Sequence, residues 1–265
     1  MAYVSNDGAL VHWDAVGRGA PLILIMGLGC SSAMWFRLAP RLAQRFRVIL
    51  IDNRGAGLTR ADFLVHRVRS MAGDVAAVLT AAGEASAHVL GLSMGGMIAQ
   101  QFALDHPQRV RSLILAATNC GGSHAELAET HIWQMLFTKA DLSPEEGLRA
   151  MAPYTYARGT AAERIEEDHV VRLASYPTRR GYQAQLYGLL GWTSYGHLPD
   201  LRCPTLVLHG TEDQLIPPGN GALLARRIPS AVLVEIEGAS HWLHTDQPEK
   251  TASLVHDFLL RDRTS

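Results

Sequence analysis

Short apolar runs, each bounded by glycine, proline or a polar turn, recur along this chain of 265 residues. They predict β-strands, because a strand buried on both faces reads as a nearly continuous apolar run. Helical periodicity fills most of the gaps between them, and this alternation is typical of βαβ units around a mostly parallel sheet. The predicted strands cover residues 22–26, 48–52, 87–92, 113–117, 205–209 and 232–237, with 9–14 as a candidate antiparallel edge strand. The predicted helices cover residues 31–44, 70–82, 94–104, 220–227 and 248–260.

The alternation breaks between residues 119 and 199, where no run typical of a buried strand occurs. A helical stretch of this length exceeds an ordinary crossover connection, so we expect a lid over the carboxyl edge of the sheet. The alternative is that these helices only thicken one layer of the fold. The pattern therefore predicts a core of residues 1–118 and 200–265 and a helical cap of residues 119–199, with helical spacing in segments 125–137, 144–151, 161–174 and 178–190.

Composition narrows the class of protein. The chain is 48% hydrophobic and 18% charged with a formal net charge of −1, so it can bury a substantial core and offers no general attraction to nucleic acid. Its first residues lack the basic and apolar segments of a signal peptide, and no apolar run approaches the roughly 20 residues of a membrane-spanning helix. We expect a soluble, cytoplasmic protein without a membrane partner. The three widely spaced cysteines are interpreted as reduced thiols.

The most informative motif is Gly-x-Ser-x-Gly at residues 91–95, with Ser93 at its centre. It follows an apolar run directly, and helical periodicity continues after it. This context predicts a serine on a sharp turn from strand to helix, where small flanking residues let the two elements approach closely. Without that context, the alternative is an ordinary loop serine. Serine is a poor nucleophile at its free pKa, so catalysis requires a histidine base and a carboxylate that orients it.

Both partners occur downstream, on loops that follow predicted strands. Asp213 lies after the apolar segment 206–208 and a glycine-containing turn, and His241 lies on the loop after the next strand. Glu212 competes with Asp213 for the orienting role. The minor alternatives for the base are His209, at a strand end, and His244, three residues beyond His241.

These segments resemble the α/β-hydrolase superfamily, in which serine, acid and histidine occur in this order. The matching stretches are GLSMG, GTEDQLIP, GASHW and, near residue 52, DNRGAG. The resemblance spans nearly the whole chain and implies an α/β-hydrolase fold: a mostly parallel central sheet flanked by helices, with a helical cap inserted after the sixth strand. It implies Ser93 as nucleophile, His241 as general base and then acid, and Asp213 as the orienting carboxylate.

Attack on a carbonyl creates an oxyanion that needs preorganised N–H donors. We expect one from Met94, at the start of the helix after the motif. The family pattern His-Gly-x places the other at Leu28. Met26 stands where many relatives have histidine, so the interactions that hold this loop are expected to differ.

The cap is rich in aromatic residues, and no motif places lysines or arginine pairs to clamp a carboxylate. We therefore expect a pocket for an apolar or aromatic acyl or alcohol group. No metal constellation, phosphate-binding loop or dinucleotide fingerprint is evident, which predicts cofactor-free chemistry. We expect a monomer or a homodimer. The candidate substrate-binding residues are Gly27, Gly29, Cys30, Trp133, Phe137, Trp192 and Trp242.

The sequence thus predicts a cofactor-free serine hydrolase that cleaves a small-molecule carboxylic ester or lactone through an acyl-enzyme on Ser93. The resemblance points to small bacterial esterases, enol-lactonases and methylesterases. The same triad would also serve a C–C bond hydrolase or a perhydrolase. A non-hydrolytic cyclase or a binding protein on the same fold is a further alternative, because a fold does not fix a function.

Overall fold

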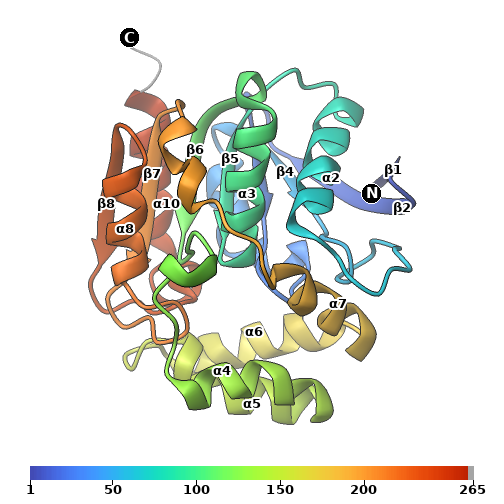
Figure 1. Ribbon diagram of the computed structural model, residues 1–265, viewed down its shortest axis with the longest axis vertical. Helices are drawn as coiled ribbons and strands as arrows, with labels where there is room; N and C mark the ends of the chain where they lie inside the picture. Colours follow the sequence, from blue (N-terminus) through green and yellow to red (C-terminus); the bar gives the residue numbers. More distant parts are fainter. Residues whose placement is uncertain (262–265) are drawn as a thin grey trace.

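A computed structural model describes residues 1–261 and contains an eight-stranded sheet in the order β1-β2-β4-β3-β5-β6-β7-β8 (Figure 1). β1 pairs antiparallel with β2, β2 pairs antiparallel with β4, and all other pairings are parallel. The predicted antiparallel strand is confirmed as β2, but its predicted edge position is wrong, because β1 pairs on its other side and forms the edge. The strand bounds are β1 Ala2–Asn6, β2 Ala9–Val16, β3 Ala20–Ile25, β4 Phe46–Ile51, β5 Ala87–Leu92, β6 Val110–Ala116, β7 Thr205–Gly210 and β8 Ala231–Ile236.

Alternate residues of the central strands pack into two separate hydrophobic cores. In β3, Ile23 and Ile25 point into one core while Leu22 and Leu24 point into the other, and all four are fully buried. This two-sided burial explains why the strand reads as a continuous apolar run. The first core contains α2 (Val68–Ala81), α3 (Met94–Asp105) and α8 (Gly219–Arg227), and the second contains α1 (Ala39–Leu42) and α10 (Pro248–Arg261).

The helix predicted over residues 31–44 is replaced by two short pieces. These are the 3₁₀ helix η1 (Ser32–Phe36) and the single turn α1. Pro40 accounts for the break, because a proline lacks the N–H that a helix interior needs and is tolerated only in a first turn. It occupies the first turn of α1.

Between β6 and β7 the chain builds α4 (Thr130–Thr138), α5 (Pro144–Thr155), α6 (Ala162–Ala174) and α7 (Arg179–Leu189), with the short 3₁₀ helices η3 (Gly122–His124), η4 (Lys139–Asp141) and η5 (Tyr195–Asp200). The four α-helices lie together across one edge of the sheet (Figure 1). We call residues 119–199 the cap. Local signals explain its boundaries: α5, for example, begins with a capping box between Ser143 and Glu146 and has Pro144 in its first turn.

The end of the predicted core, residues 262–265, lies outside the described residues. Within residues 1–261, no helix has both the length and the apolar character needed to cross a membrane. The short helix α9 (Leu243–Asp246) follows the predicted histidine loop and leads into α10.

The chain reverses its direction of travel across the sheet at β3. It runs from β3 to β4 on one side and then returns past β3 to β5. In open α/β sheets, ligands bind outside the carboxyl ends of strands at such a switch point. The loop after β3 and the turn after β5 meet there.

Candidate active site

Ser93 lies on the turn between β5 and α3 in a strained backbone conformation. Its φ of 57° and ψ of −122° are rarely adopted by residues other than glycine. The neighbouring glycines explain how the turn closes. A Cβ on Gly91 would lie 2.1 Å from the carbonyl oxygen of Gly95, and a Cβ on Gly95 would lie 2.1 Å from that of Ile25. The Gly-x-Ser-x-Gly spacing is therefore a steric requirement of this turn.

Asp213 and His241 form a buried pair on the loops after β7 and β8. Nδ1 of His241 lies 2.9 Å from Oδ2 of Asp213, and both side chains are almost fully buried. The other carboxylate oxygen, Oδ1, accepts the backbone N–H groups of Leu215 and Ile216 at 3.0 and 2.8 Å. These bonds fix the carboxylate, and the carboxylate fixes the imidazole ring with Nε2 directed away from it.

The other candidates for the acid and the base have different partners in the structure. Glu212 accepts the backbone N–H of Arg158 at 3.0 Å and also lies 3.5 Å from its guanidinium. His209 is buried with Nε2 bonded to the carbonyl oxygen of Ile216 at 2.8 Å, and burial lowers its pKa. His244 is enclosed between two tryptophan rings, and burial lowers its pKa to about 3. Asp213 is thus the carboxylate that the structure brings to His241.

The loop after β3 is braced by two polar side chains in place of the family histidine. Nδ2 of Asn53 donates to the carbonyl oxygen of Met26 at 2.8 Å. Gln185, which lies in α7 of the cap and is fully buried, accepts the N–H of Gly29 at 2.7 Å and donates to the carbonyl oxygen of Arg54 at 2.7 Å. These contacts hold Leu28 at the mouth of the turn, beside Ser93.

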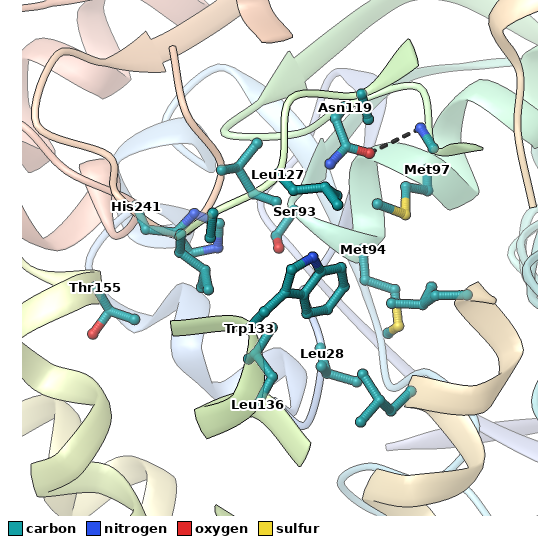
Figure 2. Close-up of a pocket in the computed structure, with 18 of the residues that line it drawn as sticks. Leu28, Ser93, Met94, Met97, Asn119, Leu127, Trp133, Leu136, Thr155 and His241 are labelled. Carbon is teal, nitrogen blue, oxygen red and sulfur yellow. Dashed lines mark hydrogen bonds between the residues drawn. The ribbon is translucent and has the colours of Figure 1, made fainter. Parts of the chain in front are cut away.

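Core and cap together enclose a cavity of about 220 Å³ next to Ser93. Figure 2 shows the Ser93 hydroxyl and the His241 ring facing this space, with Leu28 and Met94 on its wall and Trp133 of α4 across it. Neither the Leu28 nor the Met94 N–H donates to an acceptor among the described residues. Both are therefore available to a bound ligand.

Three of the seven candidate substrate-binding residues line this cavity, so the predicted wall is confirmed only in part. Gly27, Trp133 and Trp242 line it together with the neighbouring Leu28, whereas the remaining candidates do not. Gly29 lies against the ring of Tyr182, and Cys30 is buried within the second hydrophobic core. Phe137 is 39% exposed, on the outside of α4, and Trp192 donates its indole N–H to Gln101 at 2.9 Å.

Comparison of the sequence with known proteins identifies the family to which this chain belongs. Residues 20–248 match the sequence model of a family described as the alpha/beta hydrolase fold. The chain belongs to this family. The expected fold class is therefore confirmed, and the serine, acid and histidine discussed above occupy the loops of an α/β-hydrolase.

Two relatives align along most of this α/β-hydrolase. A poly(3-hydroxyalkanoate) depolymerase of Ectopseudomonas oleovorans is 33% identical over 244 residues, which cover 92% of this chain and 85% of the relative. A protein of Azorhizobium caulinodans named "Putative carbamate hydrolase RutD" is 31% identical over 254 residues, which cover 94% of both chains. Among solved structures, a thermophilic esterase from Thermogutta terrifontis has a TM-score of 0.86 and 28% identity, with 99% of each chain covered.

Sequence reasoning missed three functional candidates in this α/β-hydrolase, all of them in the cap. Gln185 braces the loop that carries Leu28, while Lys139 and Arg172 line the cavity itself. The predicted apolar and aromatic pocket thus also contains two basic side chains. No local motif marks these residues, because each reaches the site only through the packing of the cap on the core.

Proposed function

We propose that this α/β-hydrolase is a serine hydrolase that cleaves a carboxylic ester or lactone through an acyl-enzyme on Ser93. One observation carries the proposal: a strained serine at the switch point of the sheet shares a cavity with a histidine that a buried carboxylate orients. This is the arrangement that nucleophilic acyl transfer requires.

Each residue has a defined step. Nε2 of His241 removes the proton from Oγ of Ser93 as this oxygen attacks the carbonyl carbon, and Asp213 stabilises the imidazolium that forms. The N–H groups of Leu28 and Met94 stabilise the oxyanion of the tetrahedral intermediate. His241 then delivers the proton to the leaving alkoxide, which gives the alcohol and an ester of Ser93. Water, activated by the same histidine, hydrolyses that ester and regenerates the serine.

The wall of the cavity supports a substrate with an apolar segment. Next to the catalytic groups it consists largely of aliphatic and aromatic side chains, including Met97, Leu127, Trp133, Leu136 and Leu186. An apolar lining with a few fixed polar groups is the usual composition of a small-molecule site. The names of the relatives, a depolymerase of a polyester and an esterase, support cleavage of ester-like bonds.

A covalent probe tests the nucleophile before any substrate is known. After incubation with a fluorophosphonate, we expect intact-mass analysis to show one adduct per chain on the wild type and none on Ser93→Ala. His241→Ala should react more slowly by about 10⁴-fold, because the serine has lost its base. Ser123→Ala, at an exposed serine in η3 of the cap, is the matched control and should label like the wild type.

Substrate screening then follows with p-nitrophenyl esters and lactones of increasing acyl length. Persistent labelling of Ser93→Ala would remove Ser93 from the mechanism. A folded wild type that neither labels nor hydrolyses any member of the panel would overturn acyl transfer and favour a binding protein or a cyclase.

A further inference from the structure

Two basic side chains of the cap are buried inside the cavity. Lys139, in η4, is 6% exposed and Arg172, in α6, is 7% exposed, and both line the space that contains Ser93. Among residues 1–261, neither side chain forms an ion pair or a hydrogen bond. A buried cation without a counter-charge is unusual, because removal of a charge from water is costly.

Aromatic contacts offset only part of this cost. Nζ of Lys139 lies 4.5 Å from the ring centroid of Tyr182, and Cζ of Arg172 lies 5.2 Å from that of Trp242. Such cation–π contacts stabilise less than the desolvation of an ion costs. Burial, together with the nearby charge of Arg172, lowers the pKa of Lys139 to about 7. Burial in the cavity therefore disfavours the charge that the Lys139 side chain carries in water.

The acidic side chains around the pair are engaged elsewhere. Asp168 is fully buried, with Oδ1 at 3.1 Å from a guanidinium nitrogen of Arg37 and Oδ2 accepting the hydroxyls of Thr245 and Tyr156. Glu126 also lines the cavity, but its carboxylate lies against Gly219 at the start of α8. No carboxylate among the described residues pairs with Lys139 or Arg172.

Arg172 lies close to the proposed catalytic residue His241. Its guanidinium packs over the ring of Trp242, whose centroid lies 6.0 Å from that of His241. One indole ring thus separates the cation from the catalytic base. A ligand that reaches from Ser93 along Trp242 would bring its distal end to the two basic side chains.

We propose that Arg172 and Lys139 form an anion-binding subsite, and that the preferred substrate is an ester or lactone with a carboxylate distant from the bond that is cleaved. This inference rests on the proposed function, which defines the reaction. It further specifies that the substrate carries a negative charge at the end distant from the cleaved bond. A carboxylate supplies the missing counter-charge to both cations, and the fork of a guanidinium matches its two oxygens. The apolar wall next to Ser93 accommodates the chain between the two polar ends.

The first test compares esters that differ only in the distal charge. Monomethyl esters of the unbranched C4 to C8 dicarboxylic acids are measured against methyl esters of monocarboxylic acids of equal length. A second set places the carboxylate on the alcohol side. At one chain length, we expect kcat/KM of the wild type to favour the charged ester by about 10- to 100-fold, as for a hydrogen-bonded charge pair.

Variants identify the side chains responsible for that preference. In Arg172→Gln and Lys139→Met the ratio of charged to neutral kcat/KM should fall at least tenfold, whereas Lys139→Arg should retain most of it. The matched control is Arg149→Gln, at an exposed arginine of α5, which should leave the ratio unchanged. Since both esters are measured on the same variant, a general loss of folded protein cancels from the ratio.

A binding measurement separates failure of the subsite from failure of the proposed reaction. Adipate is titrated into Ser93→Ala and followed by tryptophan fluorescence, because Trp242 lies beneath Arg172. We expect saturable binding that weakens at least tenfold when Arg172→Gln is added. Equal kcat/KM for charged and neutral esters, without adipate binding, would overturn the subsite and leave the hydrolase intact. Adipate binding by a wild type that hydrolyses no ester would keep the subsite and reject the reaction.

Discussion

His244 is buried, and its burial favours the neutral form of the imidazole ring. Its ring lies between Trp35 and Trp242, with centroids 5.1 and 5.2 Å away, and neither ring nitrogen has a hydrogen-bond partner among the described residues. A neutral imidazole must still carry one N–H, so this donor is left unsatisfied. Burial first, and then the charges of Arg37 and His241, lower its pKa from 6.5 to about 3.

This shift predicts sensitivity to acid. Between about pH 6.5 and pH 3, His244 is protonated in the unfolded chain but remains neutral in the folded chain. Protonation therefore favours the unfolded state, and the free energy of unfolding decreases as the pH falls through this range. The slope from this residue is at most about 1.4 kcal/mol per pH unit. We expect His244→Leu to weaken the fall in the free energy of unfolding between pH 6.5 and 4, measured by urea denaturation. An unchanged pH profile in the variant would contradict this account.

Gln185 is predicted to be a positioning residue for the oxyanion loop. Gln185→Leu removes the acceptor of the Gly29 N–H and the donor to Arg54, so the Leu28 N–H shifts from the reacting carbonyl. We expect kcat to fall by about 100-fold, the scale for a misplaced or lost oxyanion donor. KM should change much less, and Gln185→Glu, which keeps the acceptor, should recover part of kcat. Gln134→Leu, at an exposed glutamine of α4, is the matched control.

The contrast between these residues shows what the sequence can and cannot predict at this scale. Ser93, Asp213 and His241 lie in short segments whose turn chemistry is local, so their motifs are readable. Gln185 contacts Gly29 across 156 positions of the chain, and nothing near it in the sequence signals that contact. Lys139 and Arg172 likewise lie in helical segments of the cap without any local motif, and only the packing of the cap buries them.

At the scale of elements, the turn that carries Ser93 is the least tolerant of change. We expect Gly95→Ala to destabilise the protein by more than about 3 kcal/mol, because its Cβ would meet the backbone oxygen of Ile25 at 2.1 Å and β3 must move. Gly159→Ala is the matched control, since nothing lies within 4 Å of a Cβ there. Thermal unfolding measures both. A Gly95→Ala variant with wild-type stability would show that β3 and α3 separate more readily than this geometry implies.

The elements that were predicted well share one property. β3 to β7 are short apolar runs buried on both faces or nearly so, and their sequence pattern follows from that burial. The edge strand β8 is the exception, because it is only partly buried. β1 was missed because its residues alternate between half-buried and exposed, and it is paired only on one side. The Asp7-Gly8 turn was its available signal, since both residues have positive φ and such pairs connect two-residue hairpins.

At the scale of the whole molecule, a buried ion pair joins the cap to the core. Arg37, beside η1, contacts two neighbouring carboxylates of α6: Asp168, which is fully buried, and Glu167, whose side chain is 61% exposed. Asp168 also accepts the hydroxyl of Thr245, four residues beyond His241. The same carboxylate therefore ties α6 to the core and to the segment that follows the loop of His241.

The two carboxylates provide a matched pair of variants. Asp168→Asn should lower the free energy of unfolding by about 3 kcal/mol, because the buried Arg37 loses its buried counter-charge. Glu167→Gln removes the exposed partner of the same arginine and should cost less than about 1 kcal/mol. Equilibrium urea denaturation of both proteins measures the difference. Equal effects would mean that Arg37 is solvated and that burial of Asp168 does not govern the contact.

The brace from Gln185 to the Leu28 loop limits how this protein can be recombined with its relatives. A chimera that takes its cap from another α/β-hydrolase would acquire new walls for the substrate. It would also lose the side chain that braces the loop of Leu28, the proposed oxyanion donor, unless the transplanted helix places a glutamine at the same point. Under the proposed mechanism, the cap therefore determines both the substrate that is accepted and the catalytic rate. An exchange of caps would change the substrate alone only if the new cap kept this glutamine.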